Sequence, residues 1–254
     1  MIRVRAGGQD FSAAAFVFDK DGLMFESQRF WQELSEARMR RLSQCFDGTF
    51  IRRWAELFGV TLDDGGNAVH VDPKGILAVA SPAEEIAVTA GMVVRRQGGA
   101  WDAARETAAL VFRDADASLD LRRALCPRKG FPGILRRLRE LHVPYGIATS
   151  DTVERAVASL RLFDDPDGPA FILCPGDVPR GKPHPDMLFL AAQRLGLPPQ
   201  ELVMVGDSYV DAEMAAQAGA HAIGVPESDE MRDRLQHSGA ILAADLDGIE
   251  IYRQ

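Results

Sequence analysis

The sequence has few cysteines, no long apolar run and no excess of positive charge. Its three cysteines, Cys45, Cys126 and Cys174, are widely spaced and form no CxxC pair. Such usage is typical of free thiols in a reducing compartment. No stretch approaches the roughly 20 apolar residues of a membrane helix, and the first residues lack the apolar core of a signal peptide. We therefore expect a cytoplasmic protein without a membrane partner.

Acidic residues outnumber basic ones, 37 against 29, so the formal net charge is −8. An acidic surface gains little from a nucleic acid backbone, so nucleic acid is not expected as a partner. A small anionic ligand is compatible with this charge, because a bound cation can reverse the field inside a cleft. With 254 residues, the chain can form one large domain or a core with an inserted smaller domain.

Short apolar runs alternate with helical patterns along most of the chain. Runs that are apolar at every position suit strands covered on both faces, as in a parallel sheet. The predicted strands are 13–18, 144–148, 170–174, 202–205, 221–225 and 240–242. The predicted helices are 133–141, 152–160, 186–195 and 211–218. This alternation predicts an α/β fold with a doubly wound parallel sheet, a Rossmann-like core.

One segment, residues 24–125, breaks this alternation. Its pattern is mainly helical, and the predicted helices are 27–41, 49–58, 82–94 and 102–112. The stretch from Asp63 to Gly75 is rich in Gly, Asp and Pro and is predicted to be a loop. We therefore expect an all-helical domain, residues 24–125, inserted into a core formed by residues 1–23 and 126–254.

Polar clusters directly follow four of the predicted strands, where ligands bind in open α/β sheets. The first cluster is Asp19-Lys20-Asp21-Gly22. Two carboxylates two residues apart can point the same way, and they repel unless a cation lies between them or they share a proton. Magnesium accepts such oxygen ligands. An Asp-rich turn closed by Gly22 explains this cluster equally well by itself.

Two further clusters contain groups that could bind an anion. Thr149-Ser150-Asp151 precedes a helix, where a hydroxyl and free backbone amides can bind phosphate. Taken alone, helix capping by Ser150 or Asp151 is the simpler explanation. In Gly181-Lys182-Pro183-His184-Pro185, the prolines restrict the backbone around Lys182, which could neutralise a phosphate or a carboxylate. A solvated lysine in a stiff loop is the simpler explanation of that cluster alone.

The fourth cluster is Gly206-Asp207-Ser208-Tyr209-Val210-Asp211. Asp207 directly follows an apolar strand, which is a costly place for an unpaired charge unless a metal offsets it. Ser208 and Asp211 have the spacing of a capping box, so a structural role also accounts for Asp211. Because the carboxyl ends of parallel strands share one edge of a sheet, we expect the four clusters to converge there.

Together, and in this order, the clusters resemble the motifs of the haloacid dehalogenase-like hydrolase superfamily. The resemblance is to its phosphoglycolate phosphatase and β-phosphoglucomutase branch, which carries a helical cap. The matching segments are FVFDKDG at 16–22, IATSD at 147–151, GKPHPD at 181–186 and VMVGDSYVDAEMA at 203–215. The inserted segment fits the cap in position and size. Leu23 and Glu26-Ser27 depart from residues common in the family without touching a reacting group.

The resemblance implies a magnesium-dependent phosphatase that hydrolyses a small phosphorylated metabolite through an aspartyl phosphate. It implies that Asp19 is the nucleophile and that Asp21 is the general acid and base. Phosphate-binding groups would come from Thr149, Ser150 and Lys182. The implied Mg²⁺ ligands are Asp19, the backbone carbonyl of Asp21, Asp207 and, in support, Asp211.

Other activities fit this resemblance less well. A haloacid dehalogenase would not be expected to carry the carboxylate of Asp21. A phosphonoacetaldehyde hydrolase would have a small residue there and a Schiff-base lysine in the cap, where Lys74 is the only lysine between Gly22 and Arg128. A sugar phosphomutase of the β-phosphoglucomutase type would use the same core residues and is the main alternative. A non-catalytic regulatory protein should have lost a carboxylate or the lysine of these motifs. The charged residues Asp19, Asp21, Lys182 and Asp207 are all present.

Overall fold

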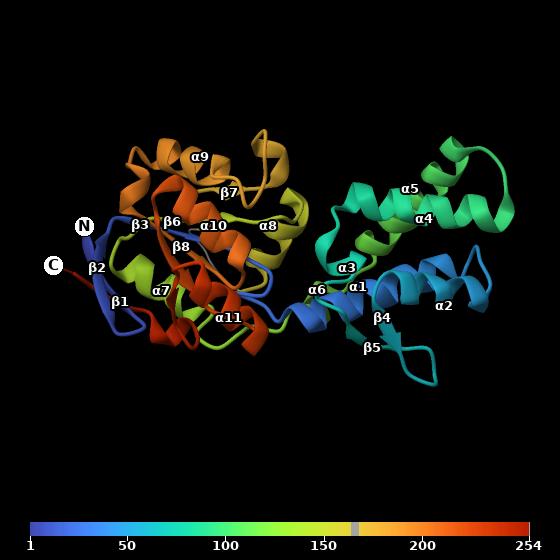
Figure 1. Cartoon of the computed structure of the whole chain (residues 1–254), viewed down its shortest axis with the longest axis horizontal. Helices are drawn as coiled ribbons and strands as arrows, with labels where there is room; N and C mark the ends of the chain where they lie inside the picture. Colours follow the sequence, from blue (N-terminus) through green and yellow to red (C-terminus); the bar gives the residue numbers. More distant parts are fainter. Residues whose placement is uncertain (164–167, 254) are drawn as a thin grey trace. The chain divides into compact units, whose positions relative to one another are not determined.

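The chain forms two compact units in the computed structural model, which describes residues 1–163 and 168–253 (Figure 1). The larger unit comprises Met1–Glu26 and Pro127–Gln254, and the smaller unit comprises Ser27–Cys126. Within the two described stretches of chain, every helix is too short or too polar to cross a membrane.

A six-stranded sheet forms the centre of the larger unit. Its order is β10-β9-β8-β3-β6-β7, and every pairing is parallel. The strands are β3 Ala15–Phe18, β6 Tyr145–Ala148, β7 Ile172–Leu173, β8 Leu202–Gly206, β9 His221–Gly224 and β10 Ile241–Leu242. The neighbouring strands β3 and β8 are buried at every position. This confirms the predicted doubly wound α/β fold, with strand ends that differ by a residue or two from those expected.

Helices flank the sheet (Figure 1). They are α7 Gly133–Glu140, α8 Val153–Arg161, α9 Asp186–Leu195, α10 Tyr209–Ala218 and α11 Asp229–His237. Helix α11 was not predicted. The core includes Val17 and Met204 from the central strands together with Leu188 of α9 and Met214 of α10. The sheet and these helices therefore fix the strand ends from which the polar clusters project.

A second, antiparallel sheet in the larger unit was not predicted. Its order is β11-β1-β2, with β1 Ile2–Ala6, β2 Gln9–Ala13 and β11 Glu250–Arg253. Burial alternates along β1, as in a strand with one covered face. Ala13, which was expected to begin the first parallel strand, ends β2 instead. This sheet was missed because β1 is short and its partner β11 lies at the other end of the chain.

The smaller unit is mainly helical, as expected, but it also contains a β-hairpin. Its helices are α1 Ser27–Leu42, α2 Gly48–Leu57, α3 Ile76–Val79, α4 Pro82–Gln97, α5 Trp101–Ala117 and α6 Leu121–Ala124. Strand β4, Val60–Leu62, pairs with β5, Ala68–Val71. The description of the segment as all-helical, with a loop at residues 63–75, is therefore wrong for this hairpin. The amide side chain of Gln28 in α1 bonds both backbone groups of Val71, a long-range contact that local composition does not reveal.

Candidate active site

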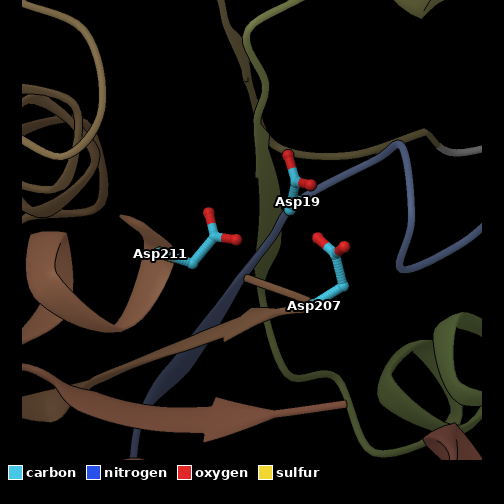
Figure 2. Close-up of side chains that lie close together, drawn as sticks. All are labelled: Asp19, Asp207 and Asp211. Carbon is cyan, nitrogen blue, oxygen red and sulfur yellow. The ribbon is translucent and has the colours of Figure 1, made fainter. Parts of the chain in front are cut away.

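Three carboxylates meet at the carboxyl ends of neighbouring central strands (Figure 2). Asp19 directly follows β3, Asp207 directly follows β8, and Asp211 lies in the first turn of α10. One oxygen atom of each carboxylate lies within 4.8 Å of the others. Asp19 and Asp211 are buried, and Asp207 is partly buried. The fold thus brings together residues from two clusters that lie far apart in the sequence.

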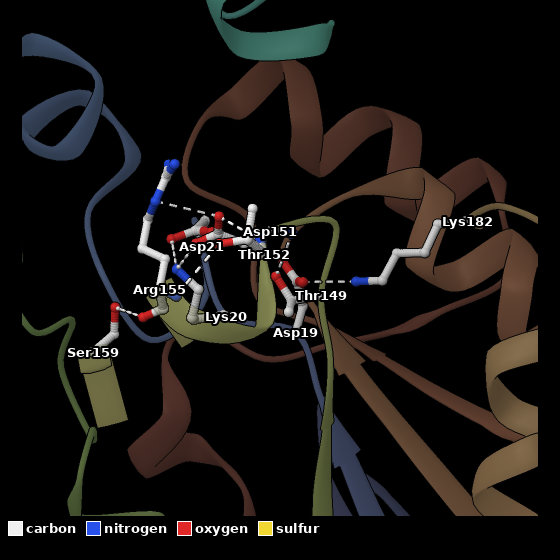
Figure 3. Close-up of polar contacts among 9 residues, drawn as sticks. All are labelled: Asp19, Lys20, Asp21, Thr149, Asp151, Thr152, Arg155, Ser159 and Lys182. Atoms are coloured by element: carbon white, nitrogen blue, oxygen red, sulfur yellow. Dashed lines mark hydrogen bonds and ion pairs between the residues drawn. The ribbon is translucent and has the colours of Figure 1, made fainter. Parts of the chain in front are cut away.

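Lys182 contacts two of these carboxylates. Its Nζ atom is 2.6 Å from Asp19 Oδ1 (Figure 3). The same atom is 2.6 Å from Asp211 Oδ1. The lysine side chain is 4% exposed, so the interpretation of Lys182 as a solvated surface residue is wrong. Burial by itself lowers the pKa of Lys182, but Asp19 and Asp211 outweigh burial and raise the pKa above its ordinary value. The lysine is therefore a fixed positive charge beside Asp19.

Asp211 uses both of its carboxylate oxygens within the protein. Oδ1 accepts a hydrogen bond from Lys182, and Oδ2 accepts one from the Ser208 hydroxyl at 2.8 Å. The backbone N–H of Ser208 also donates to Oδ2 at 3.4 Å. The capping interaction expected from the sequence and the contact with Lys182 therefore coexist. This geometry favours Asp211 as the residue that positions Lys182.

The three carboxylates carry more negative charge than Lys182 balances. Burial raises the pKa of Asp207 well above its ordinary value, and Asp19, Asp211 and Glu227 raise it further. Burial also raises the pKa of Asp19 to about 7, although Lys182 opposes the shift. A hard divalent cation takes oxygen ligands and would favour the ionised form of each group. The donor set therefore fits magnesium.

Asp21 lies outside this carboxylate group. Its side chain is 27% exposed and contacts the ammonium group of Lys20. Gly22, with a φ of 79°, turns the chain directly after it. Figure 3 shows Asp19 and Asp21 turned toward different lysines, Lys182 and Lys20. The structure thus separates two carboxylates that the sequence could only place side by side.

The loop after β6 contains the expected phosphate-binding residues. Thr149 is buried and its Oγ1 accepts a hydrogen bond from the Asp151 backbone N–H at 3.1 Å, whereas Ser150 is exposed. Helix α8 is capped by Thr152. The expectation that Ser150 or Asp151 caps this helix is therefore wrong. The Asp151 carboxylate instead lies 3.0 Å from Lys20 Nζ, an ion pair that the sequence does not reveal.

Two charged residues near the site were not singled out from the sequence. Lys20 is fully buried. Its position between two aspartates, directly after an apolar strand, was the sequence feature that could have identified it. Arg128 donates hydrogen bonds to the carbonyls of Gly22, Val225 and Pro226. It therefore ties the turn after Asp21 to the segment after β9. No local pattern marked Arg128, because its three acceptors are backbone atoms distant in sequence.

Comparisons with known proteins agree with this geometry. A family model described as haloacid dehalogenase-like hydrolase matches residues 13–219. Phosphoglycolate phosphatase of Escherichia coli (strain K12) is 33% identical over 98 residues, which cover 37% of this chain and 39% of that protein. Hexitol phosphatase A of the same strain is 36% identical over 96 residues, which cover 38% and 44%. The matched region thus spans about two fifths of each curated relative.

The fold also has a counterpart among solved structures. A β-phosphoglucomutase from Clostridium difficile superposes with a TM-score of 0.57 and covers 92% of either chain. Its sequence is 15% identical. At this identity, the similarity concerns the fold alone.

Proposed function

Because the chain belongs to the haloacid dehalogenase-like hydrolase family, we propose that it is a magnesium-dependent phosphatase. Its substrate would be a small phosphorylated metabolite, hydrolysed through an aspartyl phosphate. The observation that carries this proposal is the contact of Lys182 with Asp19 beside Asp207 at the ends of β3 and β8. The phosphatase names of the curated relatives support hydrolysis as the reaction.

In the first step, Asp19 acts as the nucleophile. One of its carboxylate oxygens attacks the phosphorus of a phosphate monoester, and the bond from phosphorus to the leaving oxygen breaks. Lys182, held by Asp211, offsets the negative charge that the phosphoryl group brings close to Asp19. The Thr149 hydroxyl donates a hydrogen bond to a phosphoryl oxygen, while its Oγ1 accepts a hydrogen bond from the Asp151 backbone N–H.

Asp21 serves both steps, first as an acid and then as a base. Its protonated carboxyl group gives a proton to the leaving oxygen. The resulting carboxylate then takes a proton from the water that attacks the aspartyl phosphate, which releases inorganic phosphate and restores Asp19. Bound magnesium, held by Asp19, Asp207 and the backbone carbonyl of Asp21, would supply charge neutralisation.

The function is tested by measuring inorganic phosphate released from an aryl phosphate and from a panel of phosphorylated metabolites. We expect release that requires magnesium and stops in EDTA. We propose residues 1–23 and 126–254 as the catalytic core and residues 24–125 as an inserted cap domain. The panel of metabolites identifies the substrate class. Transfer of the phosphoryl group to a second sugar hydroxyl without phosphate release would contradict a phosphatase. No turnover of any phosphate ester would contradict an enzyme of this type.

Magnesium should stabilise the protein, and Asp207→Asn should remove that stabilisation. At a free concentration about 100-fold above Kd, a ligand of the folded state adds about 2.7 kcal/mol to the free energy of unfolding. The raised pKa of Asp207 means that its ionisation costs stability as pH rises above the ordinary carboxyl range. The metal-free Asn variant should therefore be at least as stable as the wild type at neutral pH.

Thermal unfolding in EDTA and in excess magnesium measures both effects without an activity assay. Asp229→Asn is the matched control, because Asp229 lies on α11 with a fully exposed side chain and should leave the magnesium effect unchanged. An Asp207→Asn variant that keeps the full magnesium-dependent rise in Tm would remove Asp207 from the metal site.

Gly206 leaves room for the Asp211 carboxyl group, and Gly206→Ala should displace that group. A Cβ atom at residue 206 would lie 2.4 Å from Oδ2 of Asp211. We expect the displaced Asp211 to release Lys182 and lower kcat by about 10- to 100-fold. Steady-state kinetics measure this effect. In Gly176→Ala, the new Cβ meets no described atom within 4 Å, so this variant should match the wild type. Equal kcat for both variants would contradict the role of Asp211.

A further inference from the structure

A fully buried lysine lies between two carboxylates beside the candidate nucleophile. Lys20 directly follows Asp19 and is 0% exposed. Its Nζ atom contacts Asp21 Oδ1 and lies 3.0 Å from Asp151 Oδ2 (Figure 3). A buried ion pair often stabilises a fold no better than apolar residues of the same volume. Stability alone is therefore a weak reason for a charge at this position.

The charge of Lys20 is maintained by its two neighbours. Burial by itself lowers the pKa of Lys20, but Asp21 and Asp151 outweigh it and raise the pKa above the ordinary lysine value. The ammonium group of Lys20, in contact with Asp21 Oδ1, gives the Asp21 carboxylate a partner on the protein side. The partly exposed Asp21 side chain would otherwise have several staggered rotamers open to it.

Asp151 is anchored independently of Lys20. Its backbone N–H donates to Thr149 Oγ1, and its Oδ1 accepts the Thr152 backbone N–H at 2.7 Å. The Nε atom of Arg155, one turn into α8, lies 3.5 Å from the same carboxylate oxygen. Asp151 is thus held by the loop after β6 and by the start of α8. Through Lys20, this rigid point is connected to Asp21, which lies on a different loop.

We propose that Lys20 and Asp151 are positioning residues that set the direction of the Asp21 carboxylate. Asp151 holds Lys20, and Lys20 holds Asp21 apart from Asp19, so that the two carboxylates keep separate roles. The inference rests on the proposed function, in which Asp21 is the acid and base. A displacement of a catalytic group by about 1 Å can cost about 100-fold in rate. Loss of Lys20 should therefore impair the step that depends most on Asp21.

The test is pre-steady-state kinetics of Lys20→Met with an aryl phosphate and magnesium. Methionine preserves much of the buried apolar volume and removes the charge. Formation of the phosphoryl-enzyme needs little proton donation with this good leaving group, so the burst of aryl alcohol should keep its wild-type rate. Hydrolysis of the aspartyl phosphate needs Asp21 as a base and should slow by about 10- to 100-fold.

A double-mutant cycle with Asp21→Asn separates positioning from a general structural role. If Lys20 acts through Asp21, Lys20→Met should have no further effect on hydrolysis once Asp21 is replaced. Asp151→Asn should slow the same step as Lys20→Met. Lys129→Met, at an exposed lysine paired with Asp245, is the matched control and should leave both steps unchanged.

Each outcome separates this inference from the proposed function. A wild-type protein that turns over no phosphate ester overturns both. An active wild type with unchanged hydrolysis in Lys20→Met overturns only the positioning role. An equal loss in the wild-type and Asp21→Asn backgrounds also overturns it, because the effect is then structural. If Lys20→Met does not fold, Lys20→Met with Asp151→Asn removes both charges, and fast hydrolysis in that variant contradicts the inference.

Discussion

The Asp19→Asn variant should form no phosphoryl-enzyme and should lose at least about 10⁴-fold in kcat. An amide has nearly the shape of a carboxylate, but it is not a nucleophile toward phosphorus. Asp19 directly follows the buried strand β3, and its carboxylate contacts Lys182 at 2.6 Å, so the end of the strand and the lysine fix its position. Acid quenching followed by mass spectrometry of the intact chain detects the covalent phosphate in the wild type and its absence in the variant.

Loss of activity in Asp19→Asn should not come from unfolding. Since burial raises the folded-state pKa of Asp19 to about 7 from an ordinary value of 3.8, the protonated form is favoured by folding. That stabilisation is complete below the ordinary pKa and is lost as pH rises toward 7. In metal-free buffer, the variant should therefore match or exceed the wild type in stability at neutral pH, while Lys182 keeps Asp211 as a partner.

Exposed Asp10 on β2 provides the matched control, because Asp10→Asn removes a carboxylate of the same unit that pairs with Arg3 and has no part in the proposed chemistry. The Asp10→Asn variant should form the phosphoryl-enzyme at the wild-type rate. Covalent phosphate found on Asp19→Asn would show that another residue is the nucleophile.

The parallel sheet could be predicted because its evidence is local. A strand covered on both faces is apolar at every position, as in β3 and β8, and its buried end makes the following aspartate conspicuous. The topology of such a sheet then brings Asp19 and Asp207 to one edge without further information. The parallel sheet and the approach of these two carboxylates could therefore be predicted from the sequence.

The features that were not predicted, namely the antiparallel sheet, the β-hairpin and the buried Lys20, depend on contacts between distant parts of the chain. Strand β11, near one end of the chain, pairs with β1 near the other end. In β5, the backbone N–H and C=O of Val71 are hydrogen-bonded by the Gln28 side chain of α1. Neither contact is marked by a pattern of residues within one segment of the sequence. The burial and pairing of Lys20 were hidden for the same reason, because its partner Asp151 belongs to the loop after β6. Local patterns identify which residues are charged, but only the fold identifies which charges face each other.

The Asp21→Asn variant should form the aspartyl phosphate from an aryl phosphate and then hydrolyse it very slowly. The nucleophile Asp19 and its partner Lys182 are untouched, and an aryl oxide leaves with little proton donation, so the first step proceeds. Water still needs a base in the second step, and loss of a general base costs about 10²- to 10⁴-fold. Stopped-flow absorbance should therefore show a rapid burst of aryl alcohol, near one equivalent of enzyme, followed by very slow turnover.

A poor leaving group separates the two duties of Asp21. With an alkyl phosphate the first step also needs a proton donor, so the Asp21→Asn variant should lose its burst and accumulate no aspartyl phosphate. Asp10→Asn, the exposed control, should show fast turnover with both substrates. A burst from Asp19→Asn and none from Asp21→Asn would mean that the two roles are reversed. The separate lysine partners of the two carboxylates argue against that reversal, because only Asp19 shares its lysine with Asp211.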